Sequence, residues 1–247
     1  MTTDRRRFLA AGGSVGLGAL LAACTSSEGV ATSSAVVPTT SGSVATVAPQ
    51  TSSSVVFPEV DSCVLTPEET EGPYYFDVDS IRSDIREDRS GTPLLLAMRV
   101  RDAACKPLAN AVVDIWHCDA TGEYSGFESG TQGGKRTDQK TYLRGAQVTN
   151  ADGVVQFQTI YPGWYQGRAV HIHFKVHIDK ATVLTSQLYF DEKVSDAVYT
   201  KQSYAAHNGR RTGNAQDGIF VQGNVLTLTP QGDGYLGVMT VGVESQA

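Results

Sequence analysis

Two histidines separated by one residue, His171 and His173, form the part of the sequence best suited to chemistry. Side chains two positions apart on an extended strand share a face, so both imidazoles point the same way while the apolar residues around them face the other side. Two imidazoles on one face supply half of a metal site. A solvated pair of polar side chains would show the same spacing. His177 continues this face, either as a third ligand or as a surface residue.

The residues near this pair indicate which metal it would bind. A ferrous site of the cupin type needs a glutamate five residues after the second histidine, and that position is Ile178. A zinc site favours a further histidine, cysteine or carboxylate close by. The sequence instead offers Tyr161 and Tyr165 just upstream, and Tyr124 farther back. Phenolate is a hard, strongly donating anion, which suits a ferric ion.

Short apolar alternations separated by Gly, Asn and Asp begin at residue 61 and predict strands that would position these side chains. The expected strands are 94–101, 111–118, 154–160, 168–178, 184–190, 220–228 and 235–243. One helix is expected over 195–206. Many short strands with little helix predict an all-β fold, an antiparallel β-sandwich over residues 61–247.

The N-terminal residues are predicted to be an export signal and a tether. Residues 1–23 carry a twin-arginine pattern and a short apolar run that ends at Cys24, which resembles a lipoprotein cleavage site. Cys24 would then carry the lipid, whereas an uncleaved anchor helix is the alternative. Residues 24–60 are rich in Ser and Thr and predict a disordered tether. In either case the protein is expected to be exported and, in the first, lipid-anchored to the outer face of the cell membrane.

The net charge limits which binding partners are expected, and the cysteine content limits which disulfides can form. The chain has 26 acidic and 20 basic residues, so it lacks the basic excess expected of a nucleic-acid-binding protein. Contact with a membrane is therefore expected only through the lipid on Cys24. In an oxidising compartment, Cys63, Cys105 and Cys118 allow one disulfide with three alternative pairings.

Four separate segments resemble the intradiol ring-cleavage dioxygenases, non-haem ferric enzymes that open catechols between the two hydroxyl-bearing carbons. The segments occur in the family's order and together extend over about residues 61–191. They are Thr70-Glu71-Gly72-Pro73-Tyr74-Tyr75, residues 111–119 leading to Gly122-Glu123-Tyr124-Ser125, Pro162-Gly163-Trp164-Tyr165 with Arg168 and His171-Ile172-His173-Phe174, and Ser186-Gln187-Leu188-Tyr189-Phe190.

The resemblance implies a non-haem Fe(III) cofactor held by a defined set of side chains. The implied ligands are Tyr124, Tyr165, His171 and His173. Tyr165 is also implied to act in catalysis by leaving the metal when substrate binds, and Tyr161 is expected near the site without being the ligand. The implied pocket residues, which border the substrate ring, are Arg168 and Gln187. The residues expected to be scaffold are Trp116, His117 and Asp119.

The implied reaction inserts both atoms of dioxygen into a catechol or a relative such as protocatechuate, giving a cis,cis-muconate-type diacid. Only five residues separate Tyr165 from His171, and the helical N-terminal dimerisation region of catechol-type members is missing. The preferred catechol and the assembly, for which a homodimer is one candidate, therefore stay open. A tethered module that binds aromatic compounds or metal without turnover is the alternative function, and a zinc hydrolase is a third.

Overall fold

The computed structural model describes residues 55–58, 63–128, 136–205, 207, 209 and 211–244. The expected signal peptide and most of the expected tether, within residues 1–54, lie outside the described residues. Among the described residues, no helix combines the length and apolarity that crossing a membrane requires.

The described part of the chain is built mainly from strands. The strands are β1 (Pro93–Asp102), β2 (Val112–Trp116), β3 (Arg144–Val148), β4 (Val154–Ile160), β5 (His171–Ile178), β6 (Ala181–Tyr189), β7 (Thr227–Gln231) and β8 (Gly234–Val243). The helical elements are α1 (Glu192–Tyr199) and the single 3₁₀ turns η1 (Gln202–Tyr204), η2 (Asn214–Gln216) and η3 (Gln222–Asn224).

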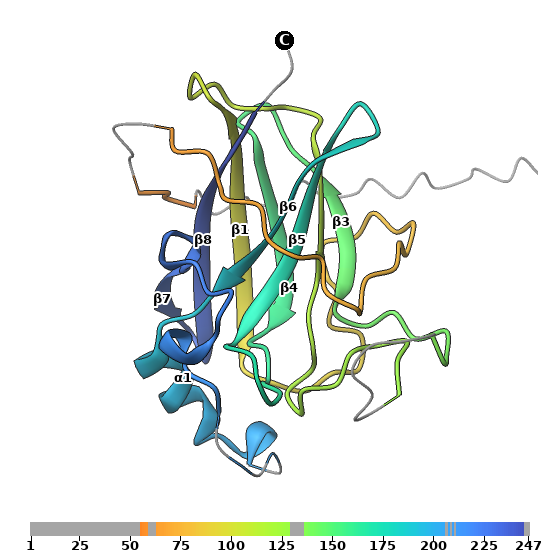
Figure 1. Cartoon of the computed structure of the whole chain (residues 1–247), viewed down its shortest axis with the longest axis vertical. Helices are drawn as coiled ribbons and strands as arrows, with labels where there is room; N and C mark the ends of the chain where they lie inside the picture. Colours follow the sequence, from red (N-terminus) through yellow and green to blue (C-terminus); the bar gives the residue numbers. More distant parts are fainter. Residues whose placement is uncertain are drawn as a thin grey trace, which may run out of the picture. The chain divides into compact units, whose positions relative to one another are not determined.

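The strands form two four-stranded sheets, with orders β4-β1-β8-β7 and β3-β2-β5-β6. One sheet lies behind the other in Figure 1, which confirms the predicted β-sandwich. Strand pairing is antiparallel with one exception, because β1 and β8 run parallel. These strands lie far apart in the sequence, so no hairpin forces them to be antiparallel.

Side chains from both sheets fill the space between them. On β5 the buried apolar residues Ile172, Phe174 and Val176 face this core, as the alternation predicts. The other face of β5 is buried as well, because residues 63–76, orange in Figure 1, cross the outer side of β5 and β6. Hydrogen bonds to β6 help to hold this crossing segment, among them Glu69 N to Thr185 O and Ser186 Oγ to Pro67 O. His171 and His173 therefore lie under a covering segment and not on a solvated strand.

The structure differs from the expected elements at three places. β3 was not predicted because its sequence, RGAQV, has no apolar alternation, and it lies at the edge of its sheet. The expected strand 220–228 is wrong over most of its length, since η3 occupies Gln222–Asn224. The helix begins before residue 195 because Asp191 caps it by accepting hydrogen bonds from the amides of Lys193 and Val194.

One of the three open disulfide pairings is present. Cys63 is bonded to Cys105, while Cys118 is a free, buried thiol that donates to the carbonyl of Gly163. The disulfide joins the covering segment to the turn after β1 across 42 positions of sequence. A cross-link over this distance restricts the unfolded chain and so stabilises the fold.

Replacing both Cys63 and Cys105 by Ser is expected to lower the free energy of unfolding by about 2–4 kcal/mol. Chemical denaturation of the oxidised proteins measures this difference. A Cys118→Ala variant is the control, because its stability should still fall when reductant is added. If reductant destabilised the Cys63→Ser/Cys105→Ser variant as much as the wild type, the disulfide would not be the source of the stability.

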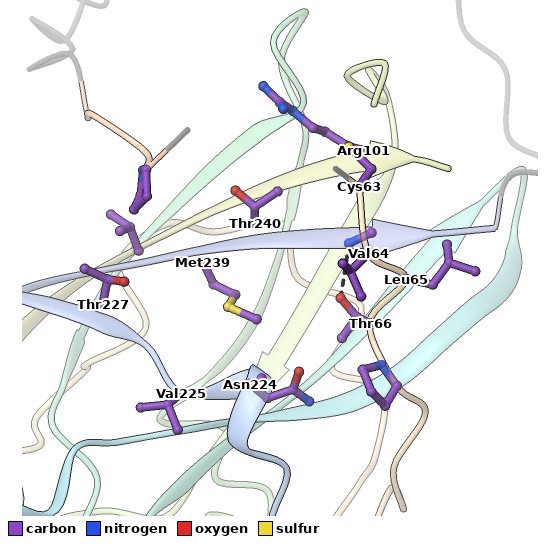
Figure 2. A pocket seen from close by; sticks show the side chains of 15 residues that line it. Cys63, Val64, Leu65, Thr66, Arg101, Asn224, Val225, Thr227, Met239 and Thr240 are labelled. Carbon is purple, nitrogen blue, oxygen red and sulfur yellow. Dashed lines mark hydrogen bonds between the residues drawn. The ribbon is translucent and has the colours of Figure 1, made fainter. Parts of the chain in front are cut away.

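A pocket of about 370 Å³ lies against the sheet that contains β1 and β8. Met239 of β8 lines it together with Val64, Thr66 and Asn224, and Figure 2 shows these side chains around it. None of the four expected metal ligands lines this pocket.

Candidate metal centre

The two tyrosines and two histidines expected to bind metal lie together. The phenol oxygens of Tyr165 and Tyr124 are 3.1 and 3.4 Å from Nε2 of His171. Nε2 of His173 is 3.0 Å from the same nitrogen. Two phenol oxygens and two imidazole nitrogens therefore meet at one point, which requires three separate segments of the chain.

Glycines bring the two tyrosine loops into contact. Tyr124 follows β2, and Tyr165 lies between β4 and β5. A Cβ atom at Gly163 would lie 2.4 Å from the carbonyl oxygen of Asp119, and one at Gly122, whose φ is +86°, would lie 2.3 Å from that of Trp164. Only glycine permits this approach. The Gly163 amide also donates to Asp119 O, which fixes one loop on the other.

The hydrogen bonding of His171 leaves one nitrogen available to a metal. Its Nδ1 lies 2.6 Å from the carbonyl oxygen of Ala169, and because a carbonyl only accepts, Nδ1 carries the proton. Nε2 of His171 then carries a lone pair and has three polar neighbours, but it can accept a hydrogen bond from only one of them at a time. A cation bound between the two imidazole nitrogens and the two phenol oxygens would accept a lone pair from all four atoms at once. These four atoms therefore fit a metal ion.

His173 is positioned mainly by packing. Its ring lies parallel to Trp116, with centroids 5.0 Å apart and an interplanar angle of 5°. On the covering segment, Gly72 leaves room for the ring: a Cβ atom there would lie 3.2 Å from Cε1 of His173. Nδ1 of His173 is buried and has no hydrogen-bond partner within the described part of the chain. Stacking on Trp116 therefore supplies the orientation that a hydrogen bond supplies to His171.

Burial controls the charge of these four groups. It lowers the pKa of His171 to about 3 and that of His173 well below its usual value, so both imidazoles are neutral at neutral pH. Burial also raises the pKa of the Tyr165 and Tyr124 phenols well above 10. Phenolates become stable in such surroundings only beside a positive charge, which a bound metal ion would provide.

Arg168 and Gln187 contact each other beside the cluster. Nη2 of Arg168 donates to Oε1 of Gln187 at 2.6 Å. Gln187 lies on β6 directly opposite His173 on β5, so their side chains share the outer face of the sheet. Nε of Arg168 donates to Asp217 at 3.0 Å. The two expected pocket residues are thus adjacent to the expected ligands, and Asp217 is a partner that sequence reasoning missed.

The other residues considered from the sequence lie outside this cluster. His177 pairs with Thr182 Oγ1 at the surface, as its surface interpretation predicted. His117 uses both ring nitrogens, on Cys118 O and Thr159 Oγ1. Tyr161 is a core residue whose hydroxyl contacts Ser195 at 2.7 Å, so the expectation that it lies near the site is not supported.

Further residues next to the ligands were not singled out from the sequence. Tyr74 stacks on Tyr124 with ring centroids 4.4 Å apart and meets Tyr165 edge-on, forming an aromatic wall. Arg144 is buried and donates to both the hydroxyl and the carbonyl of Ser125, the residue after Tyr124. Tyr74 lies within a recognised segment, whereas no spacing pattern points to Arg144. Among the described residues, no three His, Cys, Asp or Glu side chains form a metal cluster.

Behind Trp116, Asp114 accepts a hydrogen bond from Tyr75, and burial raises its pKa from 3.8 to about 7. The folded chain thus holds a proton that the unfolded chain releases between these values. The free energy of unfolding should therefore fall as pH rises through this window, by at most about 1.4 kcal/mol per pH unit. Asp114→Asn is expected to remove this part of the pH dependence of the free energy of unfolding, measured by denaturation at about pH 5 and about pH 7. Asp102→Asn, at the exposed end of β1, is the control, and an equal slope in both variants would contradict the assignment.

Comparison with known proteins places the chain in a family. Residues 70–211 match the model of a dioxygenase family, over more than half of the chain. An intradiol ring-cleavage dioxygenase from Tetranychus urticae has a solved structure that matches with a TM-score of 0.71 and 36% identity, covering 74% of this chain and 95% of that one. The chain belongs to the intradiol dioxygenase family. The chain also resembles the dioxygenase domain of a carbohydrate-binding fusion protein from Streptomyces sp. SirexAA-E, with 30% identity and a TM-score of 0.56, covering 74% and 100% of the two chains.

The curated relatives are longer than the matching region. Catechol 1,2-dioxygenase 1 from Acinetobacter lwoffii is 33% identical over a match that covers 49% of this chain and 45% of the relative. Chlorocatechol 1,2-dioxygenase from Pseudomonas sp. strain P51 is 33% identical over 42% and 46% of the two chains. The chain thus spans about half the length of the curated relatives it matches.

Proposed function

We propose that this protein is a non-haem Fe(III)-dependent dioxygenase that cleaves a catechol-type ring between its two hydroxyl-bearing carbons. The observation that carries the proposal is the meeting of two phenol oxygens and two imidazole nitrogens at one buried point. The names of the relatives, which include catechol and chlorocatechol 1,2-dioxygenases, support this substrate class.

The four ligands in this proposal are Tyr124, Tyr165, His171 and His173. Two phenolates offset most of the charge of a ferric ion, and neutral imidazoles complete the donor set. When bound, the ferric ion would draw electron density from the ring of a coordinated catechol and so make its carbon atoms reactive toward dioxygen.

The two tyrosine ligands differ in how deeply they are buried, and the proposal gives them different roles for this reason. Tyr124 is almost fully buried and stacked on Tyr74, whereas Tyr165 is partly exposed and precedes the exposed residues Gln166 and Gly167. Tyr165 is therefore the ligand that can leave when a catechol arrives. Its released phenolate would take one of the two substrate protons.

Arg168 and Gln187 would orient the substrate and stabilise charge on its oxygens. The guanidinium keeps its charge at any relevant pH and is held by two partners, so it acts as a fixed cation. Tyr74 and Tyr124 would limit access of water to the ring. The product expected from this chemistry is a cis,cis-muconate-type diacid.

The proposed setting of this reaction is outside the cytoplasm. The twin-arginine signal would direct export, and the lipid on Cys24 would then hold the domain at the outer face of the membrane through residues 24–60. Folding before export would allow iron to be loaded in the cytoplasm. Assembly as a homodimer stays a prediction.

Incubating the purified, iron-loaded protein with catechol and isotopically labelled dioxygen tests the function. The expected product is the diacid formed by cleavage between the hydroxyl-bearing carbons, with both labelled oxygen atoms incorporated. Tight binding of catechol without oxygen consumption would instead favour the aromatic-binding module. A semialdehyde product would show cleavage beside the diol and contradict the proposal.

A further inference from the structure

Asp217 lies beyond the segment that matches the family model, yet its carboxylate reaches the candidate site. It follows η2 and is almost completely buried, with 2% of its side chain exposed. Oδ2 accepts hydrogen bonds from Arg168 Nε at 3.0 Å and from the Ala169 amide at 2.9 Å. Oδ1 accepts from the Ile219 amide at 3.1 Å. One carboxylate therefore joins the loop before β5 to the segment after η2.

These contacts determine how Arg168 can be used. Asp217 takes the Nε–H, and Gln187 takes one Nη2–H. Neither of these hydrogen bonds uses Nη1, so they leave this nitrogen to contact a ligand. A planar guanidinium held on two of its nitrogens has little freedom, and the third nitrogen is then fixed in direction.

The carboxylate is suited to hold a cation. Although burial alone would raise the pKa of Asp217, hydrogen bonds from the Ala169 and Ile219 amides and the charge of Arg168 outweigh it and lower the pKa. Asp217 is thus ionised at neutral pH. Gln187 is neutral, so among these partners only Asp217 offers a charge opposite to that of Arg168.

We propose that Asp217 is a positioning residue that fixes the Arg168 guanidinium for the substrate. This inference rests on the proposed function, because it assumes that Arg168 contacts a bound catechol. A second route is available to Asp217, since the carbonyl of Ala169 holds Nδ1 of His171. If Asp217 acts through Ala169 and His171, replacing it would disturb the metal site and leave Arg168 in place. The two routes therefore predict different results.

A double-mutant cycle distinguishes the route through Arg168 from the route through Ala169 and His171. Asp217→Asn, Arg168→Met and the double variant are prepared as full-length, iron-loaded protein. Affinity for catechol without oxygen, kcat and iron content are then measured for each. Asp217→Asn keeps the size of the side chain but lacks its charge, and it is expected to weaken affinity by roughly tenfold. In the Arg168→Met background the same change should alter affinity by less than about twofold.

The expected result also includes unchanged iron content in Asp217→Asn. Asp102→Asn is the matched control, because Asp102 also accepts two backbone hydrogen bonds but at the exposed end of β1, from Ala104 and Lys106. It should leave affinity and kcat unchanged.

Two results would overturn the inference while leaving the proposed function intact. One is an equal loss of affinity with and without Arg168, which would show that Asp217 does not act through the guanidinium. The other is loss of iron in Asp217→Asn, which would show that it acts through Ala169 and His171. If wild-type protein neither bound nor cleaved catechol, the proposed function would fail and this inference with it.

Discussion

His171→Ala is expected to lose bound iron and to lower ring-cleavage activity by about a thousandfold or more. The physical reason is the central position of His171, whose Nε2 lies within 3.4 Å of the three other ligand atoms. Removing the imidazole takes one of four donors from the metal and leaves the Ala169 carbonyl without its buried donor. Iron content by elemental analysis and kcat with catechol measure the two effects.

His177→Ala is the matched control for this prediction. His177 lies on the same strand, six residues along, but its ring contacts Thr182 near the surface. Its removal should leave iron content and kcat within about twofold of wild type, as is usual for surface substitutions. Equal losses in the two variants would mean that the strand, and not the ligand set, had been disrupted. Full activity in His171→Ala would refute the metal centre.

Arg168→Met is expected to lower kcat by about a hundredfold while the protein keeps its iron. Arg168 contacts Gln187 and Asp217 and is not one of the four ligands, so the metal should remain bound. What is lost is a fixed positive charge beside the ring oxygens, where negative charge develops during the reaction. Stopped-flow measurement of single turnovers, together with iron analysis, distinguishes a slower reaction from a loss of iron.

Arg168→Lys sharpens this prediction. Lysine keeps the charge but lacks the planar fork that contacts Asp217 and Gln187 together, so most of the activity should still be lost. Arg86→Met is the control, because Arg86 forms a surface ion pair with Asp84. It should have no effect on kcat. If Arg168→Met lost its iron, or if Arg168→Lys were fully active, the role given to Arg168 would be wrong.

Much of the site could be predicted because strand geometry is regular. The two-residue spacing of His171 and His173 gives them the same face in any strand, and the structure has them on β5. The ligands in the loops were harder to predict, and only the family resemblance favoured Tyr165 over Tyr161. In the structure Tyr161 continues the core after β4 and contacts Ser195, while Tyr165 lies four residues farther along and contacts His171.

Other features depend on contacts between distant parts of the chain, which local patterns do not contain. Asp217 lies 49 positions from Arg168, and nothing in the sequence around it marks it as a partner. The parallel pairing of β1 with β8 and the choice of Cys63 with Cys105 are of the same kind. β3 was missed because an edge strand needs little apolar alternation.

A visible absorption spectrum of the iron-loaded protein, recorded before and after anaerobic addition of catechol, tests whether the two tyrosines bind a ferric ion. We expect a broad tyrosinate-to-iron charge-transfer band that shifts when catechol binds. The band should weaken in Tyr124→Phe and in Tyr165→Phe, but not in Tyr161→Phe, whose hydroxyl contacts Ser195. A protein that stays colourless after reconstitution with ferric ion, or a band that survives both Tyr124→Phe and Tyr165→Phe, would contradict a ferric centre built on these two tyrosines.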